Sequence, residues 1–193
     1  MLNLLAVMLA TAMGPLPAPA PLPACSIKYP KQMPAAGRKS ALDSLTFMVG
    51  GSQVKICYGR PAARGRTMIG GADVPYDTLW RTGANEPTTV FSSGPLTVAG
   101  VKAPAGAWSL YTVPGKTEWQ VVVNTSISQW GKEDEYTAEV RSHEVGRGTV
   151  TSEMTSAPIE QFTIHTEPAG ANGVNLVLEW ENTKVKIPIV ATQ

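Results

Sequence analysis

The stretch Leu45-Thr-Phe-Met-Val-Gly-Gly-Ser-Gln-Val-Lys-Ile-Cys-Tyr58 decides the fold class. In its second half, Val54, Ile56 and Tyr58 occupy every other position and are separated by Gln53 and Lys55. Side chains that alternate in this way lie on one face of a β-strand, whereas a helix would repeat every 3.6 residues. The glycines between the two apolar runs therefore predict a β-hairpin over residues 45–58.

The same period of two recurs along the chain, and helical periodicity is weak, with the best candidate a short turn near residues 76–81. Further strands are predicted at Thr88–Ser92, Leu96–Ala99, Ala107–Val113, Trp119–Asn124, Glu139–Val145, Gln161–His165, Leu176–Glu181 and Lys184–Ile189. We therefore predict an all-β fold, a single antiparallel β-sandwich or jelly-roll-like domain of roughly nine or ten short strands. Asn182-Thr183 predicts a turn and hence a C-terminal hairpin. Pro188 predicts an edge strand, because proline cannot donate a ladder hydrogen bond.

The N-terminal part divides into two predicted segments ahead of a single β-sandwich domain at residues 42–193. The apolar run Leu2–Met13 is shorter than the roughly 20 residues that span a bilayer. With the small residues that follow it, this run predicts a signal peptide over residues 1–24, although the expected basic residue before it is missing. Residues 25–41 read as a flexible tether. We expect an exported protein of the periplasm or cell envelope.

Cys25 has three alternative interpretations, and the sequence leaves all three open. The preceding Leu22-Pro-Ala resembles the start of a bacterial lipobox, which would make Cys25 a lipid anchor. Outside the cytoplasm, Cys25 and Cys57 are also able to form a disulfide. The third interpretation is a pair of inert thiols. A lipid anchor and a disulfide at Cys25 exclude one another.

Composition argues against several classes of partner. The formal net charge is +1, so no overall field attracts nucleic acid, and membrane contact is expected only through an anchor at Cys25. His143 and His165 are single and far apart, so we expect no metal site and no cofactor. The oligomeric state is not predicted.

The segment from Tyr58 to Thr89 differs from the rest of the chain. It holds four of the seven arginines and no lysine, and it is rich in glycine. The use of arginine without any lysine indicates a role for the planar guanidinium, which forms paired hydrogen bonds with carboxylate or phosphate. The arginines are expected either to pin a long loop by pairing with Asp73, Asp77 and Glu86, or to hold a polar ligand.

The second interpretation defines a candidate ligand site. Its members are Arg60, Arg64, Arg66, Trp80, Arg81, Asn85, Glu86 and Trp130. The favoured hypothesis is a binding module for a carbohydrate-like or anionic small ligand, with Trp80 or Trp130 as a stacking surface; Trp130 is otherwise a loop anchor. One alternative is a sugar-acting hydrolase or lyase with Glu86 as general acid or base. Another is a structural envelope protein without a small-molecule site.

Several strings of this sequence resemble a bacterial family known as domain of unknown function 2911. They include Tyr58-Gly-Arg-Pro, Trp80-Arg-Thr-Gly-Ala-Asn-Glu86, Ser109-Leu-Tyr-Thr-Val-Pro114 and Glu160-Gln-Phe-Thr163, and the similarity extends over about Leu42–Val190. The resemblance implies an exported or envelope-associated bacterial protein, and it carries no activity over to this chain.

Overall fold

The computed structural model describes residues 21–27, 35–131 and 133–192. The strands are β1 (Ala41–Val49), β2 (Ser52–Arg60), β3 (Thr88–Ser92), β4 (Leu96–Val98), β5 (Val101–Ala103), β6 (Gly106–Val113), β7 (Glu118–Asn124), β8 (Glu144–Pro168) and β9 (Gly173–Ala191). Helical elements are the 3-10 turns η1 (Ala35–Gly37) and η2 (Glu133–Glu135) and the single short helix α1 (Ala138–Ser142) among the described residues. The all-β prediction is confirmed, but β8 and β9 are far longer than the short strands expected.

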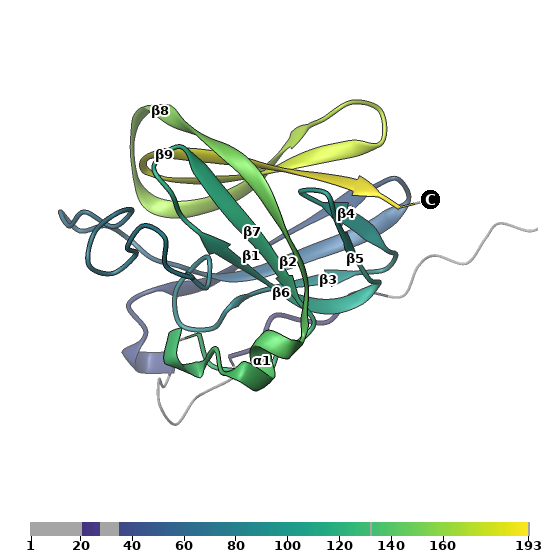
Figure 1. Ribbon diagram of the computed structural model, residues 1–193, viewed down its shortest axis with the longest axis horizontal. Coiled ribbons are helices and arrows are strands. Elements are labelled where there is room, and N and C mark those ends of the chain that lie inside the picture. Colours follow the sequence, from purple (N-terminus) through teal and green to yellow (C-terminus); the bar gives the residue numbers. More distant parts are fainter. Residues whose placement is uncertain (1–20, 28–34, 132, 193) are drawn as a thin grey trace, which may run out of the picture.

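The nine strands of the described residues belong to one open antiparallel sheet, in the order β1-β2-β3-β6-β7-β8-β9-β4-β5. The long strand β8 joins two halves: its first part pairs with β7 and its second part with β9. Figure 1 shows β8 and β9 crossing the strands of the first half. The core lies between the halves, since Ile56 and Trp108 from one side and Phe162 and Leu178 from the other belong to a single buried cluster. The arrangement is sandwich-like.

The hairpin predicted over residues 45–58 is confirmed, and it extends to the full length of β1 and β2. The turn residues Gly50 and Gly51 have φ values of 50° and 88°. Two successive positive φ angles suit the twist of a tight hairpin, and glycine adopts them without a steric penalty.

The predicted C-terminal hairpin is wrong, because β9 runs without a turn through Asn182-Thr183. The buried positions change parity there, from Leu178 and Trp180 to Val185 and Ile187. A β-bulge causes this change: the register with β8 shifts on both sides of the Ile159–Glu181 pair, and Glu181 has a φ of 52°. A hairpin and a bulge both interrupt the alternation, so the pattern alone does not separate them.

Two further predictions about local structure need correction. Pro188 does not mark an edge strand, because β9 lies between β8 and β4. The pairing of β9 with β8 ends at Val185. Proline has no backbone N–H, and at position 188 none is needed for a hydrogen bond to β8, because β9 is not paired with β8 there. Residues 139–145 were expected to form one strand, yet their first part is the helix α1, whose cap Thr137 accepts a hydrogen bond from the Val140 N–H.

Several contacts hold the described parts of the N-terminal segment against the domain. Cys25 and Cys57 form a disulfide, which leaves no thiol for a lipid, so the lipid anchor at Cys25 is corrected to a cross-link. The Arg38 side chain pairs with Glu86. Of the predicted signal peptide, residues 1–20 lie outside the described part. No helix within the described residues is long and apolar enough to cross a membrane.

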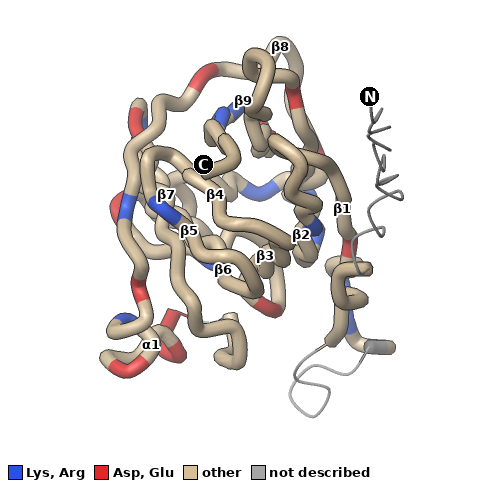
Figure 2. The backbone as a smooth tube through the Cα atoms, turned by 90° about the vertical axis from the view of Figure 1, so that its right-hand side faces the viewer, with Lys and Arg blue, Asp and Glu red and all other residues tan. Residues whose placement is uncertain are grey.

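Charged residues of both signs are interspersed along the chain. Figure 2 shows Lys and Arg positions as well as Asp and Glu positions spread over the backbone. This distribution agrees with the small net charge of +1. Any electrostatic preference for a partner must therefore come from a local group of side chains.

Candidate functional site

The connection from Pro61 to Pro87 joins β2 to β3 and carries most of the predicted site. It is a long segment without strands of its own, but it is firmly packed. Met68, Ile69 and Val74 are buried in the main core. The Glu181 carboxylate, at the β9 bulge, accepts hydrogen bonds from the backbone N–H groups of Met68 and Ile69. The bulge therefore positions this connection over the end of the sandwich.

Trp80 anchors the second half of the connection in the core. Its ring stacks on Trp180 at a centroid distance of 5.8 Å and meets Phe162 edge-on at 5.1 Å. Its indole N–H donates to the Gly83 carbonyl, and only 3% of the residue is exposed. Aromatic pairs of this kind contribute about 0.5–1.5 kcal/mol beyond burial. The predicted role of Trp80 as an exposed stacking surface has no support in this geometry.

The string that follows Trp80 forms a tight turn locked by backbone and hydroxyl groups. The Thr82 hydroxyl hydrogen-bonds to that of Thr112, and the Thr88 hydroxyl donates to the Thr82 carbonyl. The Ala84 N–H donates to the Gly59 carbonyl of β2. A Cβ at Gly59 would overlap the Ala84 carbonyl, so this close approach requires glycine. Packing therefore explains much of the Trp80–Glu86 string.

Glu86 is held in a buried ion pair with Arg38. Both guanidinium Nη atoms of Arg38 contact the carboxylate, one of them at 2.8 Å, in a bidentate arrangement. Each side chain is only 5% exposed. The neighbouring Asn85 donates to the Ser40 carbonyl at 3.3 Å. Together these contacts fix residues 38–40 against the turn, and Glu86 is not among the residues that line the cleft described below.

Arg60, at the end of β2, and the three arginines of the connection all have partners, though mostly not those expected. Arg60 donates to Phe162 and Thr163 of β8 and lies 3.7 Å from Asp43. Arg66 pairs with Asp73 at 2.7 Å, and this is the single expected pair that forms among the described residues.

The other two arginines contact segments outside the connection. Arg81 pairs with Glu133 at 3.1 Å and donates to the Gly131 carbonyl. Arg64 donates to the Lys39 carbonyl at 2.9 Å. The connection is therefore held to β8 through the hydrogen bond from the Arg64 N–H to Glu160, to the N-terminal segment through Lys39, and to Gly131 and Glu133 through Arg81.

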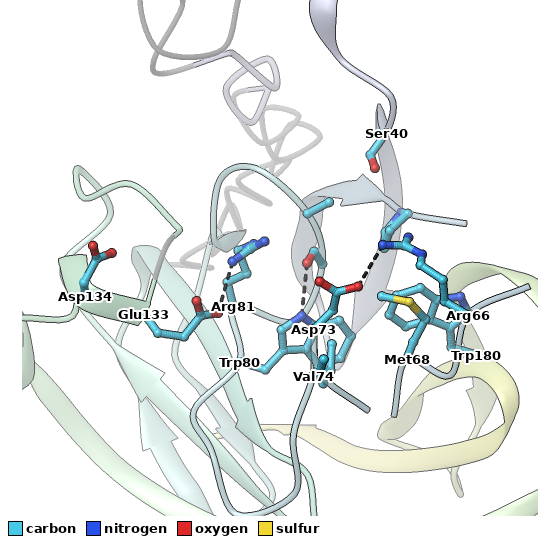
Figure 3. A pocket seen from close by; sticks show the side chains of 14 residues that line it. Ser40, Arg66, Met68, Asp73, Val74, Trp80, Arg81, Glu133, Asp134 and Trp180 are labelled. Atoms are coloured by element: carbon cyan, nitrogen blue, oxygen red, sulfur yellow. Dashed lines mark hydrogen bonds and ion pairs between the residues drawn. The ribbon is translucent and has the colours of Figure 1, made fainter. Parts of the chain in front are cut away.

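A cleft of about 640 Å³ opens where these segments meet (Figure 3). Its charged lining residues are Arg66, Asp73, Arg81, Glu133 and Asp134. Apolar surface comes from other lining residues, among them Met68, Trp80 and Trp180. Figure 3 shows the Arg66–Asp73 and Arg81–Glu133 pairs as dashed lines at two places along the cleft. Donors and acceptors thus alternate around a partly apolar surface.

The structure brings together only part of the predicted site. Arg66, Trp80 and Arg81 line the cleft, and Arg64 lines an adjoining pocket. Arg60, Asn85, Glu86 and Trp130 line neither of the two. Trp130 is 8% exposed. The neighbouring Gly131 packs so closely on the 85–86 backbone that a Cβ there would overlap the Asn85 carbonyl, which fits a loop anchor.

Sequence reasoning missed Glu133 and Asp134, whose acidic run gave the impression of a solvated loop. It also missed Arg38 and Lys39, which lie in the segment predicted as a tether. No local pattern marks these residues, because their role depends on contacts 48 and 52 positions away in the chain.

A separate buried polar cluster lies under α1. Gln129 donates to the Tyr111 hydroxyl at 2.9 Å, and Tyr136 donates to Glu144 at 2.7 Å. Burial raises the pKa of Tyr111 to about 12. Hydrogen bonds from Arg147, which also pairs with Glu144, lower the pKa of the Glu144 carboxyl below its ordinary value. These hydrogen bonds link Gln129 to β6 and Tyr136 to β8, and the four residues do not line the cleft.

Comparison with family models places the chain in a known family. The family model described as "Protein of unknown function (DUF2911)" matches residues 40–189, which covers every strand of the sheet at least in part. No curated protein and no solved structure matches the chain. The match is consistent with the resemblance noted from the Trp80–Glu86 string.

Proposed function

Because the chain belongs to the DUF2911 family, whose description carries no activity, we propose a function from the cleft itself: an exported binding module for a small polar ligand. The cleft of about 640 Å³ is the observation that carries this proposal. Ligand pockets commonly measure roughly 300–1,000 Å³ and combine apolar walls with a few directed polar groups. A carbohydrate-sized molecule fits that range.

The lining residues suit a ligand that both donates and accepts hydrogen bonds. Arg66 and Arg81 offer guanidinium donors, while Asp73, Glu133 and Asp134 offer carboxylate acceptors. A hydroxyl-rich molecule uses both kinds of group, and its C–H faces contact apolar surface. These features support the carbohydrate-like class over a purely apolar ligand.

The geometry favours binding over the alternative of a sugar-acting hydrolase or lyase. A general acid must lie within hydrogen-bonding reach of the substrate. Glu86, the residue expected to fill this role, is buried against Arg38 and is not among the cleft-lining residues. The disulfide between Cys25 and Cys57 supports export, because such bonds persist in oxidising compartments.

A thermal-shift screen of neutral sugars, sugar acids and sugar phosphates tests the proposal. A ligand at 100 times its dissociation constant adds about 2.7 kcal/mol of stability, which raises Tm by roughly 5–10 °C in a domain of this size. Asp134→Ala, on the cleft, should reduce the shift. The control Glu135→Ala changes the next residue of η2, which is exposed and does not line the cleft.

Two results would contradict the proposal. The absence of a shift with every compound would favour a structural envelope protein. Equal shifts in the Asp134→Ala and Glu135→Ala variants would place the bound ligand elsewhere on the protein.

A further inference from the structure

A second pocket of about 390 Å³ adjoins the cleft and differs from it in charge. Its lining residues are Lys39, Ser40, Pro61, Ala62, Arg64 and Arg66. Ser40, Pro61 and Arg66 also line the cleft, so the two spaces share a wall. The two spaces are therefore adjacent.

Only cations are charged among the residues that line this second pocket. Arg66 is paired with Asp73 on the cleft side. For Lys39 and Arg64, no acidic side chain among the described residues lies within ion-pair distance of the charged group. Glu160 accepts a hydrogen bond from the Arg64 backbone N–H, but it does not line the pocket. Like charges held close together repel, and a bound anion would relieve that repulsion.

The two guanidinium groups of this pocket are oriented by hydrogen bonds within the protein. Arg64 donates to the Lys39 carbonyl, which ties the two residues together. Arg66 donates to the carbonyls of Ala62 and Ala63, so its guanidinium is oriented by backbone groups. The segment that carries Lys39 is anchored by its neighbour Arg38 through the buried pair with Glu86. Pre-ordered donors lose less conformational entropy when they bind.

We propose that this pocket binds the anionic group of the ligand, a carboxylate or a phosphate, while the hydroxyl-rich part of the same molecule occupies the cleft. The proposal rests on the proposed function and narrows its ligand class to an acidic or phosphorylated sugar. Guanidinium groups match both anions through paired hydrogen bonds, and Lys39 adds a point charge.

The test is calorimetric titration with matched probes at low ionic strength. Glucose and galactose are each used as the neutral sugar, the uronic acid and the 6-phosphate, with inorganic phosphate as a separate anion. The pocket variant is Lys39→Gln/Arg64→Gln. The control, Lys102→Gln/Lys116→Gln, removes the same charge from exposed lysines that line neither space. Thermal unfolding of both variants verifies that they fold.

We expect at least one charged probe to bind wild type and control about tenfold more tightly than its neutral counterpart. The pocket variant should lose this preference and keep its affinity for the neutral sugar. Added salt should weaken only the charged probes, because the pocket is open to solvent.

The other outcomes separate the two proposals. Neutral sugars that bind as well as charged ones would overturn the anion pocket and leave the binding module standing. Inorganic phosphate that binds through Lys39 and Arg64 without any sugar would sustain the pocket and refute the carbohydrate-like ligand. Equal affinities in pocket variant and control would overturn the assignment of these residues, and a lack of binding by every probe would overturn both proposals.

Discussion

The buried pair between Arg38 and Glu86 makes the most specific prediction about stability. Substitution Glu86→Gln keeps the shape of the side chain and removes its charge. The Arg38 guanidinium then remains in a site where each partner is only 5% exposed. Its Nε atom already lacks a hydrogen-bond partner among the described residues, so the carboxylate supplies most of its compensation.

The expected cost is large. Removal of one partner from a buried ion pair destabilises a protein by about 3–5 kcal/mol, since an uncompensated charge stays buried. That is a sizeable part of the roughly 5–15 kcal/mol that stabilises a typical domain. The double variant Arg38→Met/Glu86→Leu removes both charges, and it should cost much less than either single substitution.

Urea unfolding, followed by tryptophan fluorescence, measures these differences. With a slope near 2 kcal/mol per molar urea, Glu86→Gln should lower the midpoint by about 2 M. The matched control is Asp73→Asn, which breaks the Arg66–Asp73 pair. The side chains of Arg66 and Asp73 are 53% and 54% exposed, so Asp73→Asn should reduce the free energy of unfolding by less than about 1 kcal/mol.

Two results would refute this reasoning. One is a cost for Glu86→Gln no larger than that of Asp73→Asn. The other is a double variant as unstable as Glu86→Gln, because that would show the loss to be one of packing rather than of an unpaired charge.

Three other perturbations have defined outcomes. The Cys25→Ser/Cys57→Ser variant opens a loop with a sequence separation of 32 and should lose about 3.5 kcal/mol in urea unfolding, whereas an unchanged midpoint would argue that the cross-link is absent in solution. Burial raises the pKa of Tyr111 to about 12, so the stabilisation from its neutral phenol is complete below pH 10 and is lost as the pH rises toward 12. Tyr111→Phe should therefore make the free energy of unfolding less dependent on pH in the alkaline range. An unaltered pH dependence would contradict the burial of this phenol. The pKa of the Glu144 carboxyl is lowered in the folded protein, so its contribution to stability is present above the ordinary pKa of 4.5 and is lost as the pH falls through the folded-state pKa. Glu144→Gln should make the free energy of unfolding less dependent on pH in that acidic range. A pH dependence identical to that of wild type would count against the Arg147 contact.

The strand content could be predicted because it depends on local alternation. Val54, Ile56 and Tyr58 are buried as the period of two requires, and glycine at 50 and 51 permits the turn. The change of parity around Glu181 has two solutions, a hairpin or a bulge, and only the partner strand β8 decides between them. Local pattern therefore predicts strands better than it predicts their connections.

The candidate site could be predicted only in part, for a similar reason. The excess of arginine in the connection correctly indicated a segment rich in directed hydrogen bonds. The sequence does not reveal which acid meets which arginine, because Arg38–Glu86 and Arg81–Glu133 join residues 48 and 52 positions apart. Whether Cys25 forms a disulfide depends on how close the tertiary fold brings it to Cys57, and the sequence does not reveal that distance.

The central claim is that the cleft beside the Pro61–Pro87 connection holds a ligand, and an NMR titration of the ¹⁵N-labelled protein with the tightest probe from the calorimetry tests it most directly. The account predicts that the backbone amides of Arg66, Asp73 and Arg81 and the indole N–H of Trp80 shift in a saturable manner. Shifts confined to the pocket formed by Ser126, Ser128, Glu139, Val140 and His143, or no saturable shift at all, would contradict it.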